Sequence, residues 1–463
     1  MSDSKDRLFV GTLAFALLMT LVFGAALAWD ITNNRGGAGT SQRTVTGGDS
    51  TADPNAAGNA GSAGSAGGAS RGSGGSGGGG ASANADVVPA GADIQIGAVI
   101  TQSGPLDASD AFKAQEAYVQ MVNASGGVNG HHIKLDVQND NGDPGVGKPA
   151  FEKIVQEEKA LAIVGECAPL TDVGIINEIS QFQVPVINDC LTGPAAYGNP
   201  YIWFSTQAPG TWQQLSATYL HSHADQLKFH KPWVLCVDTI VTRPYCDGFV
   251  KGWTAAGGTT CSHNACGRGD YDTEQVATTR TQYDLQASSM KASGADSIVA
   301  LLEPTNEAAF LQALTDQGMC PSNGWAQYAP LGSDPSAIRA GGNCAMGLLA
   351  STSNSYFPSE NTPGEQQLGQ ALSRYQPGTP LDNYALSIGW TPMVLFGEAV
   401  RRAGSNLSRQ TLINALNSMN GYDTNGLCKG ITWTSGNHLA PAFTRWARVT
   451  GPATYDVFTG WEG

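Results

Sequence analysis

The stretch Ile94-Gln95-Ile96-Gly97-Ala98-Val99-Ile100 decides the fold class of this chain. It is a short and almost continuous apolar run, which is typical of a strand buried on both faces. A helical pattern follows at residues 112–123, and a second strand pattern at residues 132–137. Strands that alternate with helices predict a parallel sheet with helices on both of its faces.

The alternation continues and then restarts after residue 232. Strands are expected at 160–165, 184–187, 233–238, 259–262 and 297–302, and helices at 147–159, 171–182, 247–256, 273–292 and 306–317. The pattern predicts an α/β protein with two doubly wound halves. Because ligands of such sheets bind beyond the carboxyl ends of the strands, the loops that follow strands are the candidate site.

The N-terminal region predicts a membrane segment. Residues 8–29 carry no charge over 22 positions, and as a helix they would span about 33 Å, close to the bilayer core. Lys5 and Arg7 precede the run, which keeps residues 1–7 cytoplasmic. A cleaved signal peptide is the alternative, with Ala26-Leu27-Ala28 as its cleavage site, but its apolar region would be shorter. We therefore expect an uncleaved transmembrane anchor.

Residues 30–92 form a Gly/Ala/Ser-rich tract. Positions 35–86 hold 17 of the 59 glycines and almost no large apolar side chain, so a disordered linker is expected. The formal net charge of −14 argues against a nucleic-acid partner and against adhesion to an anionic membrane surface. The folded part is expected on the extracytoplasmic side of the cell membrane, held there by the anchor.

The cysteines support an exported protein. There are nine of them, without a C-x-x-C pair or a Cys/His spacing that fits zinc. Such a chain is expected to form disulfides and to keep at least one thiol unpaired. No H-E-x-x-H motif or P-loop occurs in the folded region, so we expect neither an enzyme nor a metal or cofactor.

Several segments resemble a known family. They are the stretch from Ile96 to Leu106 (IGAVITQSGPL), the stretch from Asn123 to Gly130 (NASGGVNG), the stretch from Asn139 to Pro144 (NDNGDP), and the later Val184-Pro185-Val186-Ile187 and Asn199-Pro200-Tyr201. In order and spacing they resemble the type I periplasmic solute-binding proteins, in particular the leucine/isoleucine/valine-binding branch of ABC importers. The resemblance extends over residues 93–463, and Asn139 departs from an acidic position of the family pattern.

The resemblance implies two lobes joined by three crossover strands near residues 204–207, 348–353 and 432–437. Lobe one would then comprise residues 93–205 plus 350–432, and lobe two residues 206–349 plus 433–463. It implies that the lobes close over an amino acid or small amide and dock on an ABC permease. A ligand-sensing ectodomain of a signalling complex, built on the same fold, is the alternative.

The resemblance also implies a binding site in lobe one. Thr192 matches the family's binding threonine, Cys190 and Leu191 offer backbone groups, and Gln102 and Ser103 lie on the first loop. The family's usual serine pair falls on Ala168 and Pro169, which provide no hydroxyl, and Pro169 also lacks an N–H. Thr171 is the candidate replacement donor.

In lobe two the resemblance implies a carboxylate and an aromatic wall. Asp334 matches the family's acidic position, and Glu303 is a second acid at a strand end, with a helix-capping role as its alternative. Tyr245 matches a cleft-wall tyrosine, whereas Trp390 is expected to pack in the core. Cys167–Cys190 and Cys320–Cys344 are expected disulfides. The pairing of Cys236, Cys246, Cys261 and Cys266 stays open, and Cys428 is the candidate for the odd thiol.

Overall fold

The structure is a computed structural model that describes residues 87–463 except 104–106, 191–192, 241, 276–278, 331–333, 354–356, 358–359, 384 and 453. The expected anchor at 8–29 and nearly all of the expected linker therefore lie outside the described residues. Within the described part, no helix combines the length and the apolar character needed to cross a membrane.

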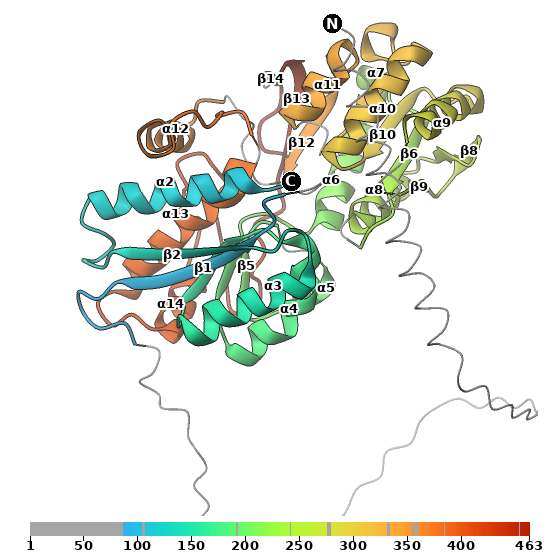
Figure 1. Cartoon of the computed structure of the whole chain (residues 1–463). Coiled ribbons are helices and arrows are strands. Elements are labelled where there is room, and N and C mark those ends of the chain that lie inside the picture. Colours follow the sequence, from blue (N-terminus) through green and yellow to red (C-terminus); the bar gives the residue numbers. More distant parts are fainter. Residues whose placement is uncertain are drawn as a thin grey trace, which may run out of the picture. The chain divides into compact units, whose positions relative to one another are not determined.

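The first sheet is entirely parallel and has the order β2-β1-β3-β4-β5. Its strands are β1 (Ile94–Ile100), β2 (Ile133–Asn139), β3 (Ala162–Glu166), β4 (Val186–Asn188) and β5 (Ile202–Phe204). Helices cover both faces, with α2 (Ser109–Ala124) and α13 (Ala385–Ala403) on one and α3 (Pro144–Glu152) and α4 (Pro169–Phe182) on the other (Figure 1). The π-helical turn Lys153–Glu157 continues α3.

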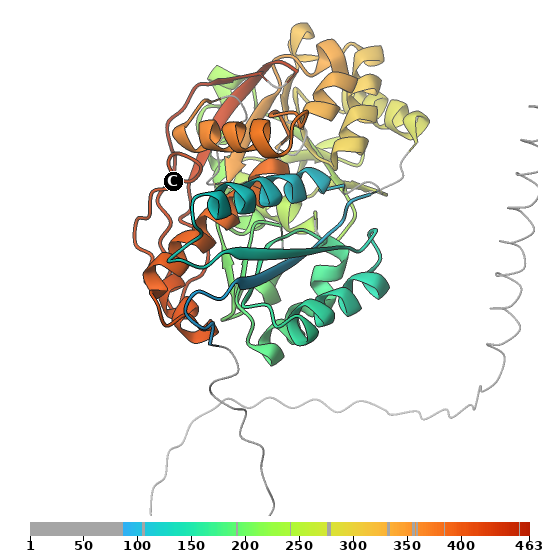
Figure 2. The ribbon, with the colours of Figure 1, turned by 60° about the vertical axis from the view of Figure 1, so that its left-hand side comes forward.

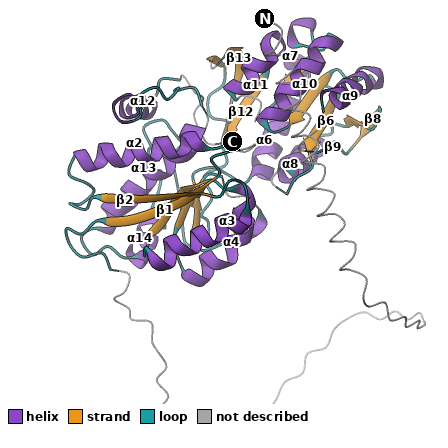
Figure 3. Ribbon diagram, viewed as in Figure 1, coloured by secondary structure: helices purple, strands orange, loops and turns teal. Residues whose placement is uncertain are grey.

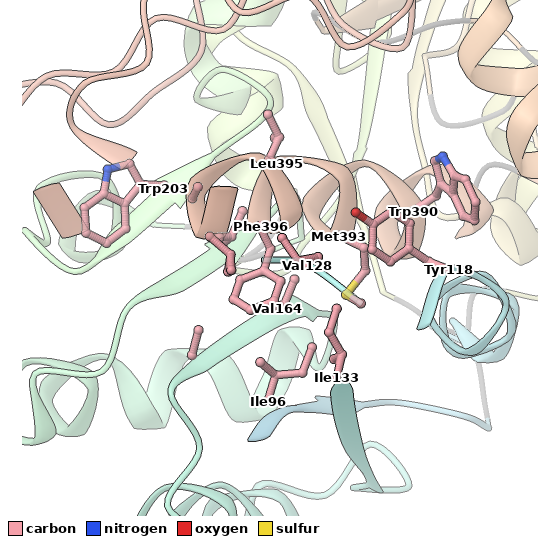
Figure 4. Close-up of a cluster of buried hydrophobic side chains, with 14 of the residues drawn as sticks. Ile96, Tyr118, Val128, Ile133, Val164, Trp203, Trp390, Met393, Leu395 and Phe396 are labelled. Atoms are coloured by element: carbon pink, nitrogen blue, oxygen red, sulfur yellow. The ribbon is translucent and has the colours of Figure 1, made fainter. Parts of the chain in front are cut away.

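The core of this lobe lies between the sheet and α13. Figure 4 shows Met393 and Phe396 of α13 directed toward Ile96 and Val164 of the strands. Trp390 is completely buried and meets Tyr118 of α2 edge to face, with 5.3 Å between ring centroids. Trp390 is thus a core residue, as expected. Three further helices complete the lobe: α5 (Pro194–Tyr197), α12 (Pro363–Tyr375) and α14 (Arg409–Leu416).

The second sheet has nine strands and is mixed. The central strands are parallel: β6 (Pro232–Val237), β10 (Ser297–Leu301), β11 (Ala326–Tyr328) and β12 (Leu349–Ser353). Beyond β12 the C-terminal strands β13 (Thr444–Gly451) and β14 (Thr454–Val457) are antiparallel, and Figure 2 shows the red β13 beside the orange β12. At the other edge lie β7 (Thr260–Ser262), β8 (Ala265–Arg268) and β9 (Asp272–Glu274). The parallel arrangement predicted from the sequence therefore holds from β7 and β9 to β12, whereas β8, β13 and β14 are antiparallel.

Helices also cover both faces of the second sheet (Figure 3). One core contains side chains of α9 (Arg280–Ser293), α10 (Pro304–Gln317) and α11 (Pro335–Gly341), and the other contains side chains of α6 (Pro209–Ser222) and α8 (Arg243–Ala255). The short α7 (Ala224–Leu227) and the 3₁₀ turns Pro321–Asn323 and Gly342–Cys344 connect these elements.

One predicted helix begins later than expected. The sequence pattern placed its start at residue 273, but α9 begins at Arg280, where Thr279 and Gln282 form a reciprocal capping box. Asp272–Glu274 instead pairs with β6 as strand β9. The segment Asp272–Glu274 thus forms backbone hydrogen bonds within the sheet and not within a helix.

The chain passes between the two sheets in three places: after β5, after β12 and before β13. Gln207, which follows the first passage, is hydrogen-bonded to the other two. Its backbone N–H donates to Ser353 Oγ at 3.2 Å, and its side-chain Nε2 donates to the carbonyl of Phe443 at 2.9 Å. The three connecting segments are therefore adjacent.

Candidate functional site

The carboxyl ends of β1, β2 and β3 converge on a buried carboxylate, Asp140. Asp140 accepts hydrogen bonds from Thr101 Oγ1 at 2.7 Å, Thr171 Oγ1 at 2.6 Å and the backbone N–H of Gly142 at 2.8 Å. Three donors satisfy a buried carboxylate without a basic partner. The hydroxyl of Thr171 is therefore engaged inside the lobe, and because Thr171 is fully buried it does not offer a donor to a ligand.

Directly beside this network lie two further acids, Glu166 at the end of β3 and Asp172 in the first turn of α4. Both are fully buried, and no Lys, Arg or His in the described part of the chain forms an ion pair with either. Burial raises the pKa of Glu166 to about 8. Burial and the neighbouring Glu166 raise the pKa of Asp172 well above its usual value. The raised pKa values favour the protonated form of both carboxyl groups.

The expected lobe-one residues occupy different positions relative to solvent. Gln102 is half-buried, and its backbone N–H donates to Asn139 Oδ1 at 3.1 Å, while Ser103 is exposed. Ala168 is fully buried at the N-terminus of α4. Cys190 is half-buried, and Leu191 and Thr192 lie outside the described residues.

Four disulfides occur in the structure. Cys167 is bonded to Cys190, which ties the loop after β3 to the loop after β4, and Cys320 is bonded to Cys344. The pairing that the sequence left open is Cys236–Cys246 and Cys261–Cys266. Cys428 is the free cysteine and is buried, and burial raises the pKa of its thiol well above the usual value.

In lobe two, Glu303 follows β10 and has no partner among the described residues. It is 8% exposed, and its carboxylate makes no hydrogen bond or ion pair with any described residue, nor does it cap α10, whose N-cap position it occupies. Burial raises its pKa to about 7. A buried acceptor without a donor is costly, so a donor supplied by a ligand would stabilise this carboxylate.

Asp334, by contrast, is engaged as the N-cap of α11. Its Oδ1 accepts from the backbone N–H of Ser336 at 2.7 Å and also from the Ser336 hydroxyl. This geometry favours Glu303 over Asp334 as the ligand acid, the reverse of the order expected from the sequence. The helix-capping alternative considered for Glu303 describes Asp334 instead.

Tyr245 lies in the first turn of α8 and is half-buried. Its ring meets Trp212 of α6 edge to face at 5.8 Å between centroids. The contact with Trp212 fixes the orientation of the Tyr245 ring. This ring lies at the carboxyl end of β6, where a wall of a ligand site would lie.

Sequence analysis missed a polar cluster next to Glu303. Asn306 Nδ2 donates to Glu274 Oε1 at 3.2 Å and to Tyr283 Oη at 2.6 Å, and Tyr283 Oη donates to Glu274. Burial raises the pKa of Glu274 to about 7 and that of Glu307 to about 8. The signal in the sequence was the pair of glutamates four positions apart at the start of α10. In the described residues no group of three or more His, Cys, Asp or Glu side chains is placed to hold a metal ion.

Comparison with known proteins identifies the family. A family model described as periplasmic binding protein matches residues 93–452. A curated relative, Leu/Ile/Val-binding protein homolog 3 from Brucella melitensis, is 28% identical over 137 residues. That match covers 28% of this chain and 36% of the relative, so the chain matches only about a third of the relative's length.

Solved structures share the fold at low sequence identity. A branched-chain amino acid ABC transporter protein from Thermus thermophilus with bound valine has a TM-score of 0.66 at 18% identity, covering 80% of this chain and 96% of that one. A solute-binding protein from R. palustris in complex with benzoate has a TM-score of 0.65 at 16% identity, with the same coverage. The proteins found in these comparisons are solute-binding proteins and not enzymes, in agreement with the expectation from the sequence. The chain belongs to the periplasmic binding protein family.

Proposed function

We propose that this protein is the extracytoplasmic solute-binding component of an ABC importer and that it captures an amino acid or small amide between its lobes. The observation that carries the proposal is the family match over residues 93–452, combined with two sheets that have parallel centres, one of which carries the Glu303 carboxylate, unpartnered among the described residues, at its carboxyl edge. Ligands of open α/β sheets bind at such edges.

In the proposed mechanism the ligand shifts a hinge. Contacts with both lobes exist only in the closed form, so the ligand stabilises closure by its differential affinity for that form. The three adjacent connecting segments around Gln207 would form the hinge. Lobe one would contribute Gln102, Ser103 and the backbone around Cys190, with Leu191 and Thr192 as further candidates from the sequence.

For lobe two we assign Glu303 as the acceptor for ligand N–H groups and Tyr245 as an aromatic wall. Asp334 remains a candidate at the same edge, with its carboxylate already bonded to Ser336. The closed form would then dock on an ABC permease, which is the partner that the family implies.

The N-terminal region completes the proposal. Residues 8–29 would anchor the protein, and residues 30–92 would act as a flexible tether that keeps the binding lobes on the extracytoplasmic side. In cell fractionation, the full chain should stay with the membrane after a carbonate wash. Release by that wash would argue for cleavage or peripheral association.

A binding screen of the full chain tests the function. Thermal shift with amino acids, amides, urea and short organic acids should identify solutes that raise Tm, and small-angle scattering with a hit should show a smaller radius of gyration. A hit that is consumed by the protein would indicate an enzyme. Binding without compaction would contradict the hinge mechanism.

A further inference from the structure

We propose that the ligand of this site is a cation, namely a primary ammonium or guanidinium compound. A carboxylate group on the ligand is not required for binding. The inference rests on the proposed function and narrows its ligand class. It starts from a charge imbalance at the carboxyl edges of the two sheets, where buried acids are present without bases.

Five acids at these edges are at least nine-tenths buried. They end β3 and β9, follow β10, or lie in the first turns of α4 and α10: Glu166, Asp172, Glu274, Glu303 and Glu307. In the described part of the chain none of them forms an ion pair with Lys, Arg or His. A buried carboxyl group without a cation either keeps its proton or receives a positive charge from a ligand.

The arginines at the same edges do not compensate. Arg243, at the start of α8, is paired with Asp238 at 2.6 Å. Arg280, at the start of α9, is paired with Asp284 at 3.1 Å and also with Asp316. Both guanidinium groups are directed to carboxylates outside the buried set, so no free base at these positions awaits a ligand carboxylate.

Glu303 is the independent observation that points to a ligand. Its carboxylate is nine-tenths buried, lacks any partner among the described residues and does not cap the helix that it precedes. An ammonium or guanidinium group would supply several N–H donors and a charge to this acceptor at once.

The described part of lobe one is poorly suited to an anion. Ala168 has no hydroxyl, Pro169 has no N–H, and the Thr171 hydroxyl donates to Asp140. Glu166 and Asp172 are buried directly beside the N-terminus of α4, where an anion would otherwise find a favourable dipole. A ligand carboxylate would find few donors at this helix start, so an ordinary zwitterionic amino acid gains little from this lobe.

Two matched sets of probes test the ligand class with the full chain. n-Butylammonium, butyramide and butyrate share a chain length and differ in charge, and agmatine and arginine share a guanidinium and differ by a carboxylate. Thermal shift and calorimetry should show binding of n-butylammonium and agmatine, no binding of butyrate, and tighter binding of agmatine than of arginine. If butyrate or leucine binds and agmatine does not, the solute-binding function stands and the cation proposal is overturned.

Variants locate the charge. Glu303→Gln keeps the shape of the side chain and should weaken agmatine binding roughly tenfold or more, while Glu303→Asp should keep the preference for the cation. Asp334→Asn removes a charge that already caps α11 and should have a smaller effect on affinity. Equal losses in the Glu303→Gln and Asp334→Asn variants would mean that Asp334 contributes as much as Glu303, and would overturn the assignment to Glu303.

Proton release gives a readout that does not depend on a variant. A bound cation lowers the pKa of the acid that it contacts, so agmatine binding at pH 6.5 should release protons, seen as different calorimetric enthalpies in phosphate and MES buffers. Butyramide should release none. Agmatine binding with no dependence on the buffer would contradict contact with a protonated Glu303.

Discussion

At the scale of single residues, Asp140 connects the loops that follow three strands. Replacing it with alanine leaves Thr101 Oγ1, Thr171 Oγ1 and Gly142 N–H without their acceptor in a fully buried place. We expect Asp140→Ala to lower the free energy of unfolding by about 3 kcal/mol and Asp140→Asn by less, because an amide retains one acceptor. Urea unfolding measures both. As a control, Asp456→Ala, at an exposed position of β14, should change the free energy of unfolding by no more than about 0.5 kcal/mol. A loss of stability equal to that of Asp140→Ala would show that the hydrogen bonds of Asp140 make no particular contribution.

Residue roles were harder to predict from the sequence than residue positions. The loops after the strands were identified correctly because apolar runs mark where each strand ends. Whether an acid before a helix caps that helix depends on its side-chain rotamer, and the pattern around Glu303 and Pro304 is the same as that around Asp334 and Pro335. Thr171 was expected to face a ligand, but its hydroxyl points to Asp140, a partner 31 positions away. Such pairings arise only once the strands are side by side.

At the scale of elements, α2 and α13 pack closely through a glycine. A Cβ added at Gly389 of α13 would collide with the carbonyl oxygen of Ala111 in α2. We expect Gly389→Ala to cost about 2 kcal/mol or more, because backbone cannot move aside as a side chain can. Gly174→Ala is the matched control: it also lies in a helix, α4, but an added Cβ meets nothing within 4 Å, so a gain of about 0.5–1 kcal/mol is expected. Thermal unfolding that ranks the two variants in the opposite order would refute this packing account.

Elements themselves were predicted best where their pattern was long and apolar. The buried strands β1, β3, β6 and β10 were all recognised from continuous apolar runs. The short β8 (Ala265–Arg268) and β9 (Asp272–Glu274) were missed because neither has a continuous apolar run, and their strand conformation comes from pairing with β7 and β6. Local sequence carries little of that information.

At the scale of the whole molecule, the excess of acidic residues includes carboxyl groups that are buried in the folded protein. Glu166 and Glu307 have pKa values near 8, and Glu274 and Glu303 near 7, all raised mainly by burial from a usual value near 4.5. The folded protein therefore binds more protons than the unfolded chain between about pH 4.5 and pH 8. Within that window the stability must fall as the pH rises.

One buried group opposes this trend. Burial lowers the pKa of His438, so its contribution rises with pH through the range near 6.5. Acids whose pKa is lowered, such as Asp270 at about 2, change their contribution only below about pH 4 and leave the window untouched. The raised carboxyl groups, which also include Asp172 and Asp189, outnumber this histidine and should give a net loss of stability on going from pH 5 to pH 8.

Urea unfolding of the full chain between pH 5 and pH 8 measures this slope. Glu166→Gln should flatten it and should stabilise the protein more at pH 8 than at pH 5, because the amide is neutral throughout. Glu157→Gln, at an exposed position, should leave the slope unchanged. A stability that rises with pH would mean that the buried acids have cations as partners in solution.

Addition of agmatine tests the link between this pH dependence and ligand binding. Because a bound cation supplies a positive charge to Glu303, agmatine should reduce the loss of stability at high pH, whereas butyrate should not.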